Sequence, residues 1–179
     1  MIWRSSSFKR IYCISLIHLY YTWFIFGMQG LMEVCMAIPN FDTNGVLPYG
    51  IYSAKLDDIR ERFCSYGNIE LREKLFKTFE KYLKEILKHK VELEVYVDGS
   101  FVTDKSEPGD IDILLFYDVE YYTSNWGTLL NDDYIKIHYK GVQVLSASLY
   151  SDSKDMTLDF AHDCEERPDV RKGLVRVEL

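Results

Sequence analysis

The chain has 179 residues, of which 47% are hydrophobic and 27% charged, and its formal net charge at pH 7 is −7. Length and composition predict one globular domain with a well-filled core, and they exclude a disordered or fibrous protein. The negative charge argues against extended nucleic acid as a partner, because phosphate backbones are bound by clustered Lys and Arg.

The four cysteines are scattered along the chain, at Cys13, Cys35, Cys64 and Cys164. There is no C-x-x-C pair, so a disulfide scaffold and a zinc site are both disfavoured. Reduced thiols in a cytoplasmic protein are the expected state.

The first 35 residues differ in character from the rest. Three basic residues precede an apolar, aromatic run over residues 11–26, which has the form of a signal peptide or a short membrane anchor. Such an anchor would export everything downstream of it. We expect instead that translation begins at Met28, Met32 or Met36, with a retained anchor and a buried helix as the alternatives. The expected domain therefore spans residues 36–179, without a membrane segment unless residues 11–26 are retained.

The next part of the chain predicts an arm followed by two helices. Residues 38–51 hold two prolines and two glycines, which indicates an extended, turn-rich segment. Ser53 is expected to cap a short helix over about 55–63. Asn68 is a good N-cap for a long helix from 69 to about 89, in which apolar residues recur every three or four positions.

The second half of the chain reads mainly as strands. We expect strands over 93–97, 111–116, 141–149 and 174–179, the last with Val175, Val177 and Leu179 on one face. Residues 125–127 suggest a loop, followed by a short helix near 128–133, and residues 158–161 are ambiguous. With the long helix on one face of the sheet, the expected class is α/β (α+β).

The loop between the first two strands carries the candidate site. It begins with Gly99-Ser100, and Asp110-x-Asp112 opens the following strand. Side chains at i and i+2 of a strand share a face, so Asp110 and Asp112 are expected to point together. Paired carboxylates repel unless a cation lies between them, and Mg²⁺ is the natural oxygen-bound choice when phosphates complete its shell.

The residues around this carboxylate pair suit a phosphate. A small-residue turn such as Gly99-Ser100 can direct N–H groups at phosphate oxygens. Lys105 could neutralise a phosphate, or it could be an ordinary solvated lysine.

The Gly-Ser turn followed by Asp-x-Asp resembles the signature of the nucleotidyltransferase superfamily. The run over residues 98–105, with flanks at 38–51, 62–63, 158–160 and 172–175, is similar to small, uncharacterised bacterial proteins with a nucleotidyltransferase-like core. This resemblance covers about residues 36–179. It implies a small mixed sheet flanked by helices, a nucleoside triphosphate held with Mg²⁺ at Asp110 and Asp112, and phosphates near Gly99, Ser100 and Lys105.

One departure from that pattern bears on catalysis. Active members use a third carboxylate on the next strand, where this chain has Gln143, and an amide can neither take a proton nor carry the charge. Asp159 is a candidate substitute from elsewhere, and Asp98 is interpreted first as a turn residue.

Three hypotheses follow. The protein is a Mg²⁺-dependent nucleotidyltransferase acting on a protein or small acceptor, or a related module that binds nucleotide or a protein partner, such as a toxin, without turnover. The third hypothesis, a sugar-nucleotide transferase with its own Asp-x-Asp, needs a larger fold than this chain offers. The sequence indicates neither the acceptor nor the base.

Overall fold

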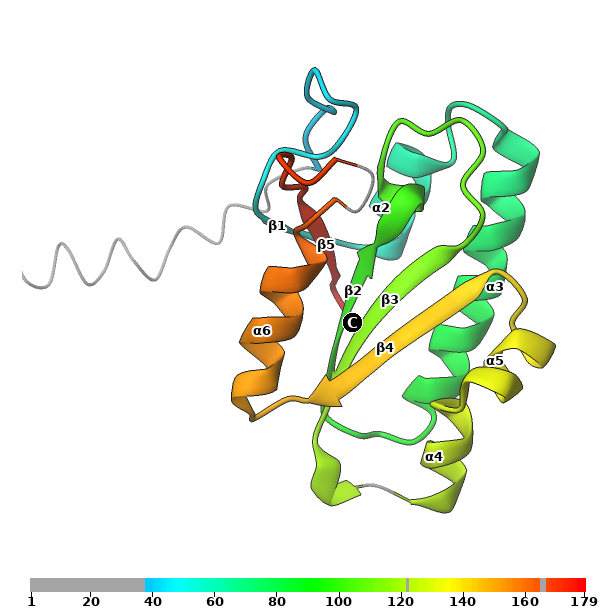
Figure 1. The fold of residues 1–179 in the computed structure, drawn as a ribbon. Coiled ribbons are helices and arrows are strands. Elements are labelled where there is room, and N and C mark those ends of the chain that lie inside the picture. Colours follow the sequence, from blue (N-terminus) through cyan, green and yellow to red (C-terminus); the bar gives the residue numbers. More distant parts are fainter. Residues whose placement is uncertain (1–37, 122, 165–166) are drawn as a thin grey trace, which may run out of the picture. The chain divides into compact units, whose positions relative to one another are not determined.

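The computed structural model describes residues 38–121, 123–164 and 167–179. Over these residues the chain forms a five-stranded mixed sheet flanked by helices (Figure 1), which confirms the α/β prediction. The expectations for the apolar segment at residues 11–26 and for a start near Met36 concern residues outside those described. None of the helices within the described ranges has the length and apolar character needed to cross a membrane.

The sheet has the strand order β1-β5-β2-β3-β4. Strand β2 runs antiparallel to β3 and β5, whereas β3 pairs in parallel with β4 and β1 in parallel with β5. The strands are β1 Ile51–Ala54, β2 Leu93–Asp98, β3 Ile111–Tyr117, β4 Val142–Ser148 and β5 Leu174–Val177. The helices are α2 Leu56–Phe63, α3 Ile69–Leu87, α4 Ser124–Leu129, α5 Asp132–His138 and α6 Asp152–Ala161, with 3₁₀ turns η1 Gly99–Val102 and η2 Val119–Tyr121.

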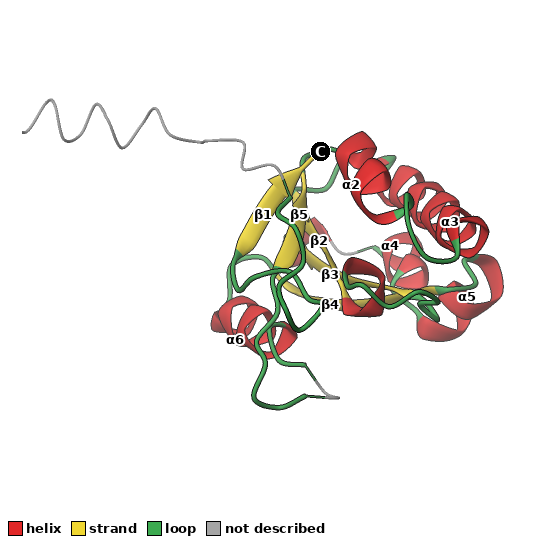
Figure 2. Ribbon diagram, turned by 90° about the horizontal axis from the view of Figure 1, so that it is seen from above, coloured by secondary structure: helices red, strands yellow, loops and turns green. Residues whose placement is uncertain are grey.

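One face of the sheet packs on the long helix α3, as predicted. Alternate strand residues such as Val95, Val97 and Ile113 are buried there against Phe76 and Phe79 of the helix. Figure 2 shows α2, α3, α4 and α5 on this side of the sheet. The side chain of Asn68 accepts a hydrogen bond from the main-chain N–H of Leu71 at 3.1 Å, so the predicted helix cap is confirmed.

The opposite face packs on α6. Tyr96, Leu114 and Phe116 alternate with the residues above along β2 and β3, and they form a second buried cluster with Leu158 and Ala161 of α6. The ambiguous stretch 158–161 is therefore the last turn of a helix.

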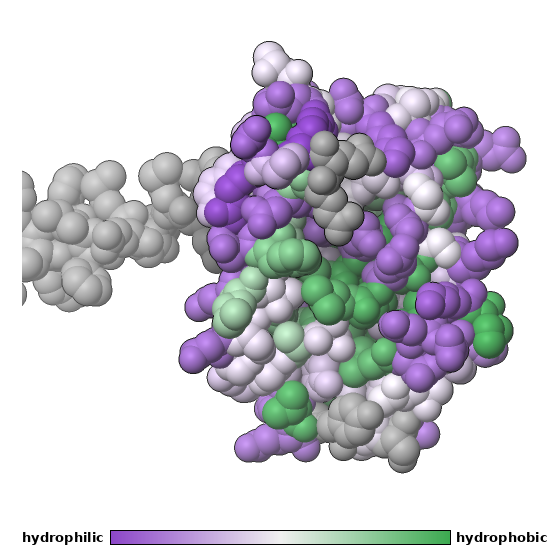
Figure 3. Space-filling view, in the orientation of Figure 1, coloured by the Kyte–Doolittle hydropathy of each residue, from purple (hydrophilic) through white to green (hydrophobic). Residues whose placement is uncertain are grey.

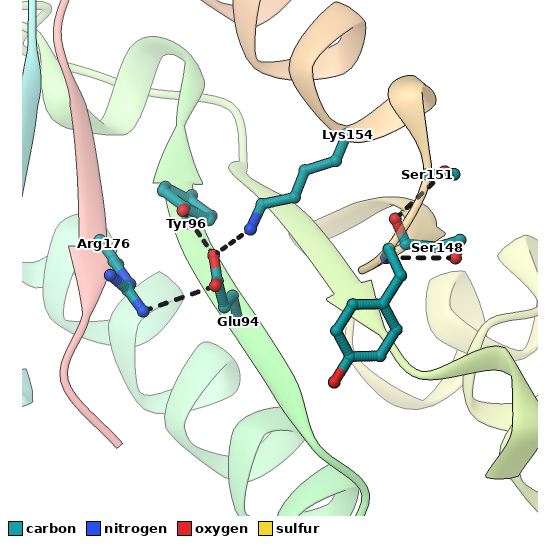
Figure 4. Close-up of polar contacts among 7 residues, drawn as sticks. Glu94, Tyr96, Ser148, Ser151, Lys154 and Arg176 are labelled. Atoms are coloured by element: carbon teal, nitrogen blue, oxygen red, sulfur yellow. Dashed lines mark hydrogen bonds and ion pairs between the residues drawn. The ribbon is translucent and has the colours of Figure 1, made fainter.

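A polar network holds α6 to the sheet (Figure 4). The carboxylate of Glu94 lies 2.9 Å from Lys154 Nζ on α6 and 3.6 Å from Arg176 on β5, and it accepts a hydrogen bond from the Tyr96 hydroxyl at 2.7 Å. Burial by itself raises the pKa of Glu94, but the hydrogen bonds from Lys154 and Tyr96, with the charge of Arg176, lower it overall.

Three local predictions were wrong. Ser53 lies in β1, and Lys55 is the N-cap of α2. Residues 125–127 are helical, because Trp126 is fully buried in the core and the packing of its side chain outweighs the weak helix propensity of its neighbours. The single helix expected at 128–133 does not form. This stretch holds the end of α4 and the start of α5, and Leu130 and Asn131 separate the two helices.

The predicted closing strand forms, but it is shorter than expected. Val175 and Val177 are buried, whereas Leu179 lies beyond β5 and is 58% exposed.

Candidate functional site

A cleft of about 930 Å³ lies at the edge of the sheet where β2 ends and β3 and β4 begin. Phe160 and Ala161 of α6 form part of its wall, and Ile135 and Lys136 of α5 form another part. The five residues singled out from the sequence all line it: Gly99, Ser100, Lys105, Asp110 and Asp112. The structure thus brings them together around one space.

A row of polar side chains crosses three strands at this edge. Asp98 is the register partner of Asp112 across β2 and β3, and Asp112 is the partner of Gln143 across β3 and β4. Residues paired across neighbouring strands share a face, so these three side chains project to the same side. Asp110 directly precedes β3 and also lines the cleft.

Gln143 lies on β4, the strand next to β3, and its side chain contacts Asp110. The Nε2 atom of Gln143 donates a hydrogen bond to Oδ2 of Asp110. An amide therefore stands beside Asp110 at the position where the resemblance to nucleotidyltransferases implies a third carboxylate.

Gly99 is required by the position of Asp112. Its φ angle is +76°, and a Cβ atom added there would lie 1.6 Å from Oδ2 of Asp112. The Asp112 carboxylate thus rests directly against the main chain of Gly99, which a residue with a side chain would prevent. Ser100 follows within η1 and lines the cleft.

Arg72 of α3 fixes the loop that carries Lys105. Its side chain is fully buried. The apolar periodicity of the helix did not predict this, because Arg72 is not one of the apolar positions. The guanidinium donates hydrogen bonds to the main-chain carbonyls of Phe63, Phe101, Thr103 and Lys105. A planar guanidinium with five N–H donors can bind several carbonyls at once. This one side chain therefore connects the loop over residues 101–105 to α3. The Lys105 side chain is exposed.

Asp98 was expected as a turn residue, and this is wrong. It ends β2, is 7% exposed, and its Oδ1 lies 2.8 Å from Nζ of Lys172, which also lines the cleft. Asp98 and Lys172 are too far apart in the sequence for any local spacing to link them. The one indication of a role for Lys172 in the sequence was that it lies in the stretch 172–175, which forms part of the resemblance.

Asp159 was the candidate from the sequence for the third carboxylate that the resemblance implies. Its exposed side chain accepts a hydrogen bond from Arg171 at 2.6 Å, and this bond lowers the pKa of Asp159. Asp159 is not among the described residues that line the cleft.

The donor atoms at this edge suit a Mg²⁺ ion shared with phosphate. Within residues 38–121, 123–164 and 167–179, no group of three or more His, Cys, Asp and Glu side chains is arranged to hold a metal. Mg²⁺ commonly takes one or two carboxylates and completes its shell with substrate phosphates and water. Asp110 and Asp112 provide such a pair, whereas Asp98 is committed to Lys172.

Fold and site together define a small α/β protein with a carboxylate-lined cleft at one edge of a mixed sheet. Residues 39–178 match a family of unknown function, DUF6932, and the chain belongs to this family. No curated protein and no solved structure matches the chain.

Proposed function

We propose that the protein is nucleotidyltransferase-like and binds a nucleoside triphosphate with Mg²⁺ in the cleft, with slow or absent nucleotidyl transfer to a protein or small acceptor. The observation that carries this proposal is that Asp110 and Asp112 line one cleft together with the Gly99 turn, against which the Asp112 carboxylate lies. The sequence resemblance supports the same assignment.

Each part of the site has a role in this proposal. Asp110 and Asp112 would hold Mg²⁺, which neutralises phosphate charge and activates the attacking hydroxyl when it is bound. Gly99 and Ser100 would contact phosphate oxygens. The assignment of Lys105 to a phosphate stays a prediction from the sequence.

The cleft also has an apolar wall that suits a base. Leu145 and Phe160 both line it and are 51% and 65% exposed. Figure 3 shows hydrophobic side chains gathered over the middle of this face with hydrophilic ones around them. The volume of about 930 Å³ is within the range of small-molecule sites, about 300 to 1,000 Å³.

Gln143 is the reason to expect little turnover. Its amide cannot accept the proton of an acceptor hydroxyl, and the loss of one general base lowers a rate by about 10² to 10⁴. Binding does not depend on that proton transfer. The same observation favours the alternative function, a binding module without turnover that engages a protein partner, for example in a pair of the toxin–antitoxin type.

Calorimetry with the full chain tests the binding proposal. Each of the four common nucleoside triphosphates is titrated with and without Mg²⁺. We expect Mg²⁺-dependent binding that is abolished by the double change Asp110→Asn, Asp112→Asn, with the fold preserved by circular dichroism. The matched control Asp57→Asn, Asp58→Asn removes two exposed carboxylates outside the cleft and should bind normally.

Turnover is tested separately with radiolabelled nucleotide. Gln143→Glu should raise any labelling of an acceptor, because it restores a carboxylate beside Asp110. Rapid labelling by the unaltered protein would contradict the role given to Gln143. A folded protein that binds no nucleotide would refute the proposal and leave the partner-binding alternative.

A further inference from the structure

Lys172 stands apart from the other lysines of the cleft. Its side chain is 12% exposed and its ammonium lies 2.8 Å from Oδ1 of Asp98, whose side chain is 10% exposed. Lys105 and Lys136 also line the cleft, but both are exposed. Lys172 is therefore a cation with a defined position, whereas the other two can adopt many rotamers.

The main chain at Lys172 is held from two directions. Its N–H donates to the carbonyl of His162 at 2.8 Å, and Nδ1 of His162 donates back to the carbonyl of Lys172 at 2.6 Å. On the other side, the N–H of Gly173 donates to the carbonyl of Leu47 at 2.8 Å. A Cβ atom on Gly173 would lie 2.4 Å from the carbonyl oxygen of Pro48, so the segment fits closely against the arm.

Asp98 directs the ammonium toward the candidate site. It is the residue immediately before Gly99, and it lies opposite Asp112 in the sheet register. The Asp98 carboxylate holds the ammonium in an ion pair, and an ammonium has three N–H donors to offer to ligands. Among the described residues Lys172 forms no ion pair with a second carboxylate, so the remaining donors suit the oxygens of an anionic ligand in the cleft.

We infer that Lys172, positioned by Asp98, binds the phosphate groups of the nucleotide, in place of the Lys105 expected from the sequence. This inference rests on the proposed function. The physical reason is pre-organisation, since a flexible lysine loses rotamer freedom when it binds phosphate and Lys172 has already lost it.

The test compares two double variants of the full chain. Lys172→Met alone would leave Asp98 buried without its partner and could unfold the protein, so Asp98→Asn, Lys172→Met removes both charges together. The control Glu94→Gln, Lys154→Met removes a comparable ion pair, 2.9 Å long, that links the same strand to α6 outside the cleft. Lys105→Met is measured alongside. Mg²⁺ complexes of ATP and of inorganic tripolyphosphate are the probes, titrated by calorimetry, and adenosine serves as the ligand without phosphate.

We expect the Asp98, Lys172 variant to bind both triphosphate probes about 10- to 100-fold more weakly, the range for loss of a charge-assisted hydrogen bond. Its affinity for adenosine should not change, and the control pair should bind all probes normally. Unchanged triphosphate affinity in the Asp98, Lys172 variant, or a larger loss in Lys105→Met, overturns the inference and leaves the proposed function standing. If the folded, unaltered protein binds neither triphosphate, the proposed function fails and the inference fails with it.

Discussion

Gly99→Ala is the most direct test of the arrangement around Asp112. The new Cβ would lie 1.6 Å from Oδ2 of Asp112, whereas real Cβ contacts stay at 3.0 Å or more, so the carboxylate must move by at least 3.0 − 1.6 = 1.4 Å. Metal–ligand distances in proteins stay within about 0.2 Å of their standard values, far less than this shift. Mg²⁺-dependent binding of nucleotide should therefore be lost.

The same change should lower stability by a predictable amount. A left-handed φ of +76° disfavours alanine by about 1 to 2 kcal/mol. For a chain of this length that corresponds to a fall in Tm of about 2 to 8 °C. Gly109→Ala is the matched control, because among the described residues no atom beyond its chain neighbours lies within 4 Å of its added Cβ, and we expect neither effect there.

Thermal unfolding by circular dichroism and calorimetry with a Mg²⁺–nucleotide measure the two effects on the same samples. A Gly99→Ala protein with lowered Tm but normal Mg²⁺-dependent affinity would show that Asp112 is not a metal ligand. An unchanged Tm would refute the backbone argument itself.

Three further predictions concern the body of the domain. Arg72→Met should lower the free energy of unfolding, measured in urea, by about 3 to 5 kcal/mol, because it leaves buried carbonyls without a hydrogen-bond donor. Arg60→Met on the surface should have little effect. A loss under about 1 kcal/mol for Arg72→Met would contradict the proposed anchoring role of Arg72. Burial raises the pKa of the Cys64 thiol to about 11, so at pH 8 only about 0.1% is thiolate. Iodoacetamide should spare Cys64 and modify Cys164 in the native protein, as read by peptide mass spectrometry, and equal modification of both would refute this. The pKa of Glu94 is lower in the folded protein than its ordinary value of 4.5, so its stabilising effect is present above that pH and lost as the pH falls below it. Glu94→Gln should flatten the decline of Tm between about pH 5 and pH 3, and identical pH profiles would exclude this contribution.

Short-range patterns in the sequence determined most of the framework. Asn68 caps α3 because its side chain reaches a main-chain N–H three residues on, and this depends on neighbouring residues alone. Asp110 and Asp112 were predicted to lie together from the period of two in strand geometry, and both line the cleft. The strand over 141–149 followed from its apolar run, whereas the position of Gln143 beside the carboxylates was implied by the resemblance to nucleotidyltransferases.

The tertiary structure decided the features that join distant parts of the chain. Trp126 is helical because the core buries it, and Arg72 is buried because four carbonyls, one at Phe63 and three within residues 101–105, surround its guanidinium. Asp98 and Lys172 form their ion pair only when β5 lies beside β2. These contacts depend on register and packing between segments far apart in sequence, and no local spacing of residues encodes them.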